Sequence, residues 1–342
     1  MQFIKANINI NFVGKRKIAY VLSALLILIS IGSLIIHKGP RYGVDFAGGT
    51  LLQVSFENTV QINDIQSGLN SVGLEKTSVQ RFGDENANEY LVRTNTPIKT
   101  SEGFTTRIEE ALKKSTGKGS HILRVEMVGP QVGKDLREKA LYALFFSILF
   151  IAIYISGRFE LKWVLSGVIA AALFCVVYVL SIFNVSIPIL ITAALVLSVI
   201  LFWALGLKYA LGAVIALIHD VTITVGAFSI LEKEFTLPII AALLTILGYS
   251  LNDTIIVFDR IRENLKKQQK DTLDITINKG INETLSRTIL TSLLTLFSVV
   301  ALFIFGGEII HDFAFAMIVG IVIGTYSSIF VASPILLEMQ GE

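Results

Sequence analysis

Long runs of residues without charge constrain this chain more than any other feature of its sequence. The run from Trp163 to Leu207 has 45 residues and contains no Asp, Glu, Lys or Arg. A helix that crosses a bilayer needs about 20 predominantly apolar residues, so this run alone is long enough for two. The whole chain is 53% hydrophobic and 16% charged, against about 25% charged in soluble proteins. The sequence therefore predicts a polytopic α-helical membrane protein.

Eight stretches of the sequence have the length and apolarity of a membrane span. Their residue ranges are 18–36, 140–156, 163–183, 185–207, 209–231, 235–258, 288–307 and 313–337. Asn184 and Pro188 mark a turn inside the long uncharged run. The first stretch is longer than the roughly 7–15 apolar residues of a signal peptide, so we expect it to be retained as an anchor.

The distribution of Lys and Arg predicts the orientation of these spans, because basic residues concentrate in cytoplasmic loops. The N-terminal segment 1–17 carries Lys15, Arg16 and Lys17, and the connection 259–287 is also strongly basic. An even number of spans puts both segments and the C-terminus in the cytoplasm. The connections that then lie outside, such as "EKE" and "GGEIIHD", have few basic residues.

Residues 37–133, between the first two spans, have the composition of a soluble domain. The stretches "GTLLQVSF", "TSVQRFG", "EYLVRTN" and "HILRVEMVG" predict four strands. The stretches "INDIQSGLNSVG" and "SEGFTTRIEEALKKSTG" predict two helices that end at glycine. The order βαββαβ is that of a ferredoxin-like α+β domain, and the topology puts this domain outside the cytoplasm. Residues 138–342 then form the bundle of spans.

Ionisable residues inside spans are the strongest functional signal, because each costs about 2.5–3.5 kcal/mol at the bilayer centre. Asp220 lies near the middle of its stretch, with His219 beside it. Asp253 lies near the cytoplasmic end of its stretch, and Arg287 lies where the next stretch begins. We therefore expect Asp253 and Arg287 at similar depth. A nearby arginine and burial would act in opposite directions on the charge of Asp253, as a proton-switched carboxylate requires.

Each of these residues also has a purely structural interpretation. Asp253 could hydrogen-bond a neighbouring helix, and Arg287 could extend its charge to the interface. Asp220 could form a structural pair with His219. Hydroxyl side chains follow Arg287, largely on one helical face, and suit either a hydrated path or close helix packing. These hydroxyl residues are Thr288, Thr291, Ser292, Thr295 and Ser298.

The stretch "GVDFAGGT" has the glycines of a phosphate-binding loop but not its lysine, and it precedes a strand rather than a helix. We interpret it as a tight turn, formed by Gly48 and Gly49, that positions Asp45. The single cysteine, Cys175, excludes an intrachain disulfide and a multi-cysteine metal site. We expect no metal, no cofactor and no nucleic-acid partner.

The two intramembrane aspartates also raise the hypothesis of an aspartyl protease. Asp220 and Asp253 lie on different spans, however, and no further catalytic pattern accompanies them. We therefore expect that the protein is not an enzyme.

Several stretches together resemble the SecF family, the smaller half of the SecDF protein-export motor and a relative of the resistance-nodulation-division (RND) transporters. They occur in the family's order, from the soluble domain to the C-terminus. These stretches are "GVDFAGGT", "VGPQVGKDLREKA", "YISGRFE", "ALGAVIALIHDV", "GYSLNDTIIVFDRIREN", "NETLSRTILTS" and "FGGEIIHDFAFAMIVGIVIGTYSSIFVASPIL".

The resemblance implies an inner-membrane subunit that works with SecD and the SecYEG channel, with YajC as a further partner. Its other contacts would be membrane lipid and the unfolded polypeptide that is being translocated. In the family, the transmembrane ion gradient drives a late, ATP-independent stage of export. The family's transmembrane aspartate and arginine correspond to Asp253 and Arg287, and Asp220 is a further motif residue. Asn252 stands where the related SecD helix has an acidic residue.

The chain departs from the family pattern at residues 161–207. In the family, "RFE" is followed almost directly by "ALGAVIALIHDV", so we predict an inserted two-helix hairpin that raises six spans to eight. The sequence contains no SecD half, which favours a heterodimer. Two other functions stay open, namely a subunit of an RND-type small-molecule exporter and a non-conducting scaffold subunit of a membrane complex.

Overall fold

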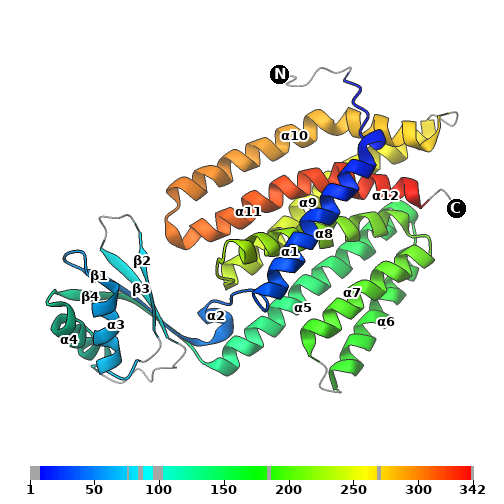
Figure 1. Ribbon diagram of the computed structural model, residues 1–342. Coiled ribbons are helices and arrows are strands. Elements are labelled where there is room, and N and C mark those ends of the chain that lie inside the picture. The colour runs from blue at the N-terminus through cyan, green and yellow to red at the C-terminus, as the bar shows by residue number, and fades with distance from the viewer. Residues whose placement is uncertain are drawn as a thin grey trace.

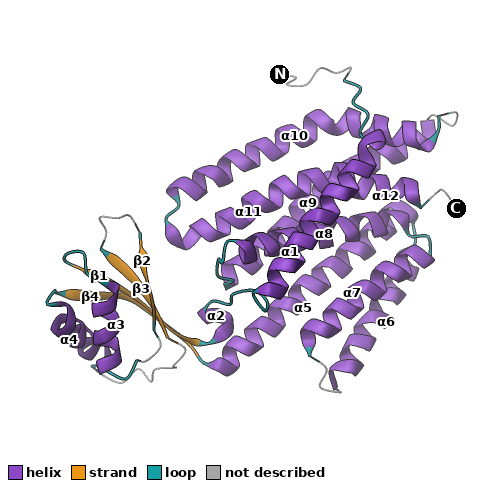
Figure 2. Cartoon of the chain, in the orientation of Figure 1, coloured by secondary structure: helices purple, strands orange, loops and turns teal. Residues whose placement is uncertain are grey.

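The computed structural model describes residues 8–74, 77–83, 88–94, 103–182, 186–267 and 271–339. These residues form a bundle of helices with a small sheet at one end (Figure 1, Figure 2). The first long helix, α1 (Arg16–Ile36), begins at the end of the bundle far from the sheet, and the last helix, α12 (Ser333–Glu338), finishes there.

Six helical segments in the described ranges are long and apolar enough to cross a membrane. The helices that build them are α1, α5 (Pro130–Ile155), α8 (Lys208–Ile230), α9 (Leu237–Lys267), α10 (Leu273–Phe305) and α11 (Glu308–Ser327). Each of them overlaps a stretch that the sequence predicts as a span. The polytopic architecture is therefore confirmed.

The long uncharged run forms two further helices, α6 (Trp163–Ile182) and α7 (Ile187–Ala204), which stand as a hairpin beside α5 and α8 (Figure 1). Their apolar segments in the described ranges, Trp163–Val179 and Pro188–Ala204, are shorter than the six spanning segments, so the total of eight spans stays a prediction. Pro188 lies in the first turn of α7, where its missing N–H costs no helical hydrogen bond. The other predicted turn residue, Asn184, lies outside the described residues.

Helices α9 and α10 extend beyond the stretches predicted for them. α9 continues past residue 258 to Lys267, and α10 begins at Leu273 rather than at residue 288. The additional turns carry charged side chains that pair along the helix, such as Glu263 with Arg260 (3.1 Å) and with Lys267 (2.6 Å). Hydropathy predicts only the part of a helix that lies in an apolar environment. The helical hydrogen bonds of the backbone continue beyond that part, so the predicted stretches are too short.

The last predicted span, 313–337, is not one uninterrupted α-helix. Between α11 and α12, residues Ser328–Ala332 form a π-helical turn, and the hydroxyl of Ser333 donates to the carbonyl of Ser328 (2.7 Å). π-turns inside α-helices are frequent at functional sites. This one directly follows Ser327, a member of a buried polar network.

The sheet domain, residues 49–128, lies at one end of the bundle. Its strands are β1 (Gly49–Phe56), β2 (Ser78–Phe82), β3 (Glu89–Thr94) and β4 (Ser120–Val128), and its helices are α3 (Ile62–Ser71) and α4 (Phe104–Thr116). The order along the chain is βαββαβ, as the sequence predicts. The spatial order is β2-β3-β1-β4, and every neighbouring pair is antiparallel.

One face of the sheet packs against α3 and α4 and forms the core of this domain. Alternation along the strands puts Leu52 of β1 and Val92 of β3 on this face, and both are fully buried. The hydroxyl of buried Tyr90 accepts a hydrogen bond from the N–H of Val60 and donates to its carbonyl. The opposite face carries Arg93 and other polar side chains toward the end of the bundle.

Candidate functional site

The glycine-rich stretch connects the sheet domain to the bundle. Residues Val44–Ala47 form one helical turn, α2, directly before Gly48 and Gly49. This turn presents the Asp45 carboxylate to the start of α9, where Oδ2 accepts a hydrogen bond from the N–H of Leu237 (2.8 Å). A carboxylate at a helix N-terminus is favourable, because it satisfies an otherwise unbonded N–H and complements the helix dipole. Asp45 is therefore an N-terminal cap of α9 supplied from elsewhere in the chain.

Gly48 and Gly49 turn the chain from α2 into β1. Gly48 has φ +74°, a conformation that favours glycine, and a Cβ there would lie 2.7 Å from the Cα of Pro130. Gly49 also has a positive φ, +126°. The pair is needed because the chain must reverse direction while touching the first residue of α5.

The connection between α8 and α9 is bonded to the same stretch. The N–H of Gly43 donates to the carbonyl of Phe235 (2.9 Å), and the N–H of Phe235 donates to the carbonyl of Arg41 (2.7 Å). Glu234, whose side chain is 14% exposed, forms an ion pair with Arg93 of β3. Burial lowers the pKa of Arg93 to about 10, so it is still charged at neutral pH. The sheet is thus bonded directly to the connection between the end of α8 and the start of α9.

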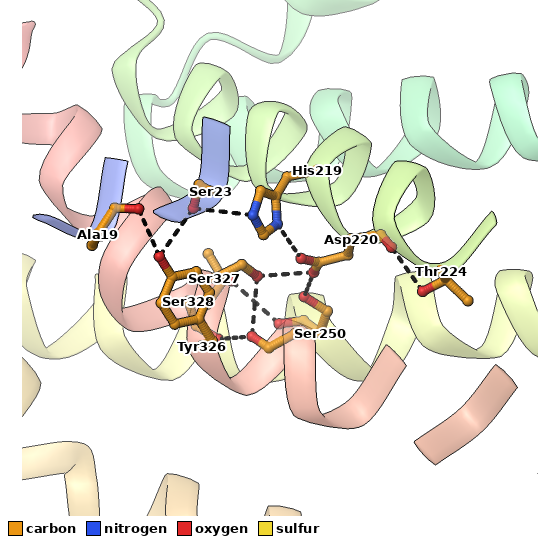
Figure 3. Close-up of polar contacts among 11 residues, drawn as sticks. Ala19, Ser23, His219, Asp220, Thr224, Ser250, Tyr326, Ser327 and Ser328 are labelled. Atoms are coloured by element: carbon orange, nitrogen blue, oxygen red, sulfur yellow. Dashed lines mark hydrogen bonds and ion pairs between the residues drawn. The ribbon is translucent and has the colours of Figure 1, made fainter. Parts of the chain in front are cut away.

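Asp220 on α8 lies in a dense polar network at the centre of the bundle (Figure 3). Its side chain is fully buried. Oδ2 accepts hydrogen bonds from Ser250 of α9 (2.6 Å) and Ser327 of α11 (2.9 Å), and Oδ1 lies 2.9 Å from Nδ1 of His219. Three helices therefore meet at one carboxyl group, and both of its oxygens have partners.

The network continues from His219 to α1. Nε2 of His219 lies 3.2 Å from the hydroxyl of Ser23, which lies 3.0 Å from the hydroxyl of Tyr326. The Tyr326 hydroxyl in turn donates to the carbonyl of Ala19 (2.8 Å). Figure 3 shows this chain of contacts from α8 through α1 to α11.

The hydrogens of this chain of contacts can be assigned in order. The single hydroxyl hydrogen of Tyr326 goes to Ala19, so Ser23 donates to Tyr326 and accepts from Nε2 of His219. One more hydrogen then lies between Nδ1 of His219 and Oδ1 of Asp220. This hydrogen completes the chain of contacts from the Asp220 carboxyl group to the Ala19 carbonyl.

Asp253 on α9 has a sparser environment. Its side chain is buried, with 2% of the residue exposed. Oδ2 accepts a hydrogen bond from Ser292 of α10 at 3.3 Å, and Ser292 also lies 2.7 Å from the hydroxyl of Thr325 on α11. One turn before Ser292, the buried hydroxyl of Thr288 has no partner among the described residues. Within the part of the chain that the structure describes, the Asp253 carboxyl group therefore has one long hydrogen bond, where that of Asp220 has three shorter contacts.

The structure does not join Arg287 to Asp253 in an ion pair, although both residues are described. The Arg287 side chain is exposed, and it is near enough to interact with Asp253 through Coulomb attraction. Asn252 is exposed as well, so it faces away from the carboxyl group that follows it in sequence. Of the predicted site residues, all of which are described, only Asp220 and His219 are joined by a hydrogen bond between their side chains.

Most of the predicted hydroxyl face on α10 bonds within its own helix. Thr291, Thr295 and Ser298 donate to carbonyls of the preceding turn. Of these hydroxyl residues, Ser292 is the one bonded to other helices within the described ranges. Within the described ranges, His, Cys, Asp and Glu side chains form no group of three or more, so no metal site is assigned.

Sequence reasoning missed the partners of the two aspartates. Ser23, Ser250, Tyr326 and Ser327 complete the Asp220 network. One signal for them exists in the sequence, because "TYSS" places four hydroxyl residues in succession inside an apolar span. Which helix those hydroxyls face depends on packing between segments far apart in the chain.

The helices of the bundle are long and apolar enough to span a membrane, and they bury the carboxyl groups of Asp220 and Asp253. A small domain of strands and helices lies at one end. These features define the class as an integral membrane protein with titratable groups inside its helix bundle. The family described as protein export membrane protein SecD/SecF, C-terminal, matches residues 108–200 and 183–342, and the SecD/SecF GG motif matches residues 33–60. The chain belongs to the SecF family of protein translocase subunits, as its relatives also indicate.

Two of these relatives are similar to the chain over nearly its whole length. The SecF subunit of Calditerrivibrio nitroreducens is 40% identical over 97% of this chain and 95% of its own length. That of Magnetococcus marinus is 41% identical over 99% of this chain and 94% of its own length. The two segments matched by the C-terminal family overlap at residues 183–200, in the region of the α6–α7 hairpin. That residues 161–207 are an insertion stays a prediction.

Two solved structures of SecDF resemble the whole chain at 30% identity. The structure from Thermus thermophilus covers 99% of this chain with a TM-score of 0.76, and the super-membrane-facing form covers all of it with a TM-score of 0.63. This chain spans 40% of the length of each of those SecDF chains. The two scores also mean that the two SecDF structures differ from each other over the matched region.

Proposed function

We propose that this chain is the SecF half of an ion-driven protein-export motor. With SecD, it uses the transmembrane ion gradient to drive a late, ATP-independent stage of export through SecYEG. Its function is transport, and no step requires an enzyme active site. YajC and the translocating polypeptide are further partners under this proposal.

The observation that carries the proposal is the environment of Asp253. A buried carboxyl group needs hydrogen bonds or a paired charge to be stable as an anion, and Asp253 has one hydroxyl partner at 3.3 Å. Arg287 acts on it from the surface of the next helix. A group held this loosely can exchange a cation or proton at a small cost in structure, which suits an ion-coupling residue.

The attachment of the sheet domain supplies a route from ion binding to movement. Asp253 lies on α9, and the first residue of α9 is capped by Asp45. Glu234, just before α9, pairs with Arg93 at the centre of the sheet. A shift of α9 on ion binding would therefore be transmitted directly to the sheet domain.

The proposed assembly follows from the same elements. The sheet domain is a ferredoxin-like domain on the outer side of the cytoplasmic membrane, eight helices span the bilayer, and both termini are cytoplasmic. The SecDF chains are more than twice as long as this one, and in the proposed assembly SecD supplies the other half of the bundle.

The energy available from the gradient is sufficient for such a motor. One elementary charge that crosses 100 mV supplies about 2.3 kcal/mol. By the relation of 1.4 kcal/mol to a tenfold change, this shifts an equilibrium between two arrangements roughly 40-fold.

The experiment is export of a secreted reporter in cells depleted of their own SecF, comparing the wild type with Asp253→Asn at equal membrane levels. The proposal predicts that Asp253→Asn assembles with SecD but does not support export. The matched control is Asn252→Ala, an exposed neighbour whose loss leaves the carboxyl group in place. Wild-type export by Asp253→Asn would instead favour a scaffold subunit.

A further inference from the structure

An open cavity of about 660 Å³ lies between α1, α7, α8 and the last helical turns of the chain. Its lining is mostly apolar, and it has no Asp, Glu, Lys or Arg among the described residues. Residues that represent its walls are Ala24, Ile27, Val196, Val199, Ile218 and Ile335. Val196 and Ile200 are 55% and 51% exposed, so the cavity is open along the side of α7.

One end of this cavity holds a buried hydroxyl group without a partner. The hydroxyl of Tyr20 is buried, and none of the described residues hydrogen-bonds to it. Three other polar groups on the wall have partners, since Ser23 and His219 bond within the Asp220 network and Thr192 donates to the carbonyl of Pro188 (2.8 Å). Thr222 is a further hydroxyl residue on the wall. An unpaired buried hydroxyl costs about 1–3 kcal/mol, so Tyr20 fits a ligand that brings a hydrogen-bond acceptor.

Basic side chains lie directly beyond that end. Tyr20, Ala24 and Ile27 follow one another at helical spacing along the wall of α1, and Lys17 precedes Tyr20 by one turn on the same face. Lys15 and Lys17 are exposed, and neither forms an ion pair among the described residues. Arg16 is paired with Glu338 at 3.1 Å and lies beside Asp274, so Lys15 and Lys17 are the basic groups of this end that are left for an anion.

We propose that the cavity binds one anionic glycerophospholipid. An acyl chain lies in the apolar part, an ester carbonyl accepts a hydrogen bond from Tyr20, and the phosphate lies beside Lys17. Along α1, the apolar wall, the unpaired hydroxyl of Tyr20 and the exposed lysines follow in the order of the matching groups in such a lipid. An apolar helix of a partner protein would fill the cavity but would leave the Tyr20 hydroxyl unpaired.

The proposal gives the α6–α7 hairpin a role, because α7 supplies one wall of the cavity. The lipid would connect this hairpin to α1, which carries Ser23 of the Asp220 network. It is independent of whether Asp253 couples to an ion.

The test is native mass spectrometry of the purified full-length chain during titration with dioleoylphosphatidylglycerol, which is anionic, or dioleoylphosphatidylcholine, which is zwitterionic. We expect one phosphatidylglycerol to be retained, with at least fivefold preference over phosphatidylcholine. Tyr20→Phe and Lys17→Gln should each weaken this retention roughly three- to tenfold, the range expected for one hydrogen bond or one exposed charge contact.

The matched pair of variants is Ala24→Phe, which fills the cavity, and Leu25→Phe, which adds a ring at the exposed neighbouring position. Ala24→Phe should lose the lipid and Leu25→Phe should retain it; if Ala24→Phe does not fold, Val196→Phe tests the same wall from α7. Retention by Ala24→Phe at the wild-type level overturns the proposal. Equal retention of both lipids, unchanged in Tyr20→Phe, also overturns it and indicates a cavity that takes any alkyl chain.

Discussion

The two buried carboxyl groups of this bundle lie on neighbouring helices and have opposite surroundings. Asp220 has hydrogen-bond partners from its own helix, from α9 and from α11, at 2.6 to 2.9 Å. Among the described residues, the Asp253 carboxyl group has one hydrogen-bond partner, Ser292, at 3.3 Å. Both are costly inside a membrane, but only the first is fully compensated. We infer that Asp220 stabilises the packing of the bundle and that Asp253 is free to change its charge.

Because their hydrogen bonding differs, substitutions of Asp220 and Asp253 should affect different properties of the protein. A residue whose bonds join three helices should affect unfolding when it is changed, and a loosely bonded residue should affect activity. The loss of stability on substitution is therefore expected to be largest at Asp220 and smallest at Asp253.

The largest loss of stability is expected for Asp220→Ala. The change leaves Ser250, Ser327 and His219 without their shared partner in the middle of the bundle. Removing one member of a buried pair costs about 3–5 kcal/mol, which should appear as a large fall in the thermal midpoint of unfolding of the purified chain. Asp220→Asn, which keeps acceptor and donor groups at the site, should fall by less. Equal, small shifts for both variants would mean that Asp220 does not hold these helices together.

A smaller loss is expected for Gly48→Ala. The new Cβ requires an unfavourable positive φ and would lie 2.7 Å from Pro130, so we expect a cost of about 1–3 kcal/mol. The matched control is Gly32→Ala in α1, where a Cβ would meet nothing within 4 Å and alanine favours the helix. Limited proteolysis of the connection between the sheet domain and α5 reports the change. If both variants are cut at the wild-type rate, the close approach at Gly48 is not required.

An effect of about 1 kcal/mol is expected for the ion pair between Glu234 and Arg93, because it is partly shielded from solvent. The double-mutant cycle of Glu234→Gln and Arg93→Gln should give this coupling energy in unfolding of the sheet domain. The reversed pair, Glu234→Arg with Arg93→Glu, should recover export that either reversal alone reduces. Additive single-variant effects would show that the two residues act independently.

The positions of these groups differ in how far the sequence predicts them. Asp220 and Asp253 are visible because a carboxylate is rare within an apolar run. Tyr326 and Ser23 are not, because hydroxyl residues are common in membrane helices and the contact joins residues about 300 positions apart. The same limit applies to Asp45, whose partner at Leu237 is 192 residues away. Hydropathy also did not predict where the helices end, because α9 and α10 continue beyond the apolar stretches as charged helices.

The smallest change in stability is expected for Asp253→Asn, below about 1 kcal/mol, because a single long hydrogen bond is altered. The thermal midpoint of this variant should therefore lie close to that of the wild type, in contrast to Asp220→Ala. A large fall would mean that Asp253 is also a structural residue, and the comparison between the two carboxyl groups would fail.

The most direct test of the central claim is ion movement in proteoliposomes that contain this chain together with SecD. A membrane potential is imposed, and ion uptake is followed for the wild type, Asp253→Asn and Ser292→Ala. Our account predicts that Asp253→Asn abolishes uptake while its thermal midpoint is unchanged, and that Ser292→Ala, which keeps the carboxyl group, retains it. Uptake by Asp253→Asn at the wild-type rate would contradict the assignment of Asp253 as the ion-coupling residue.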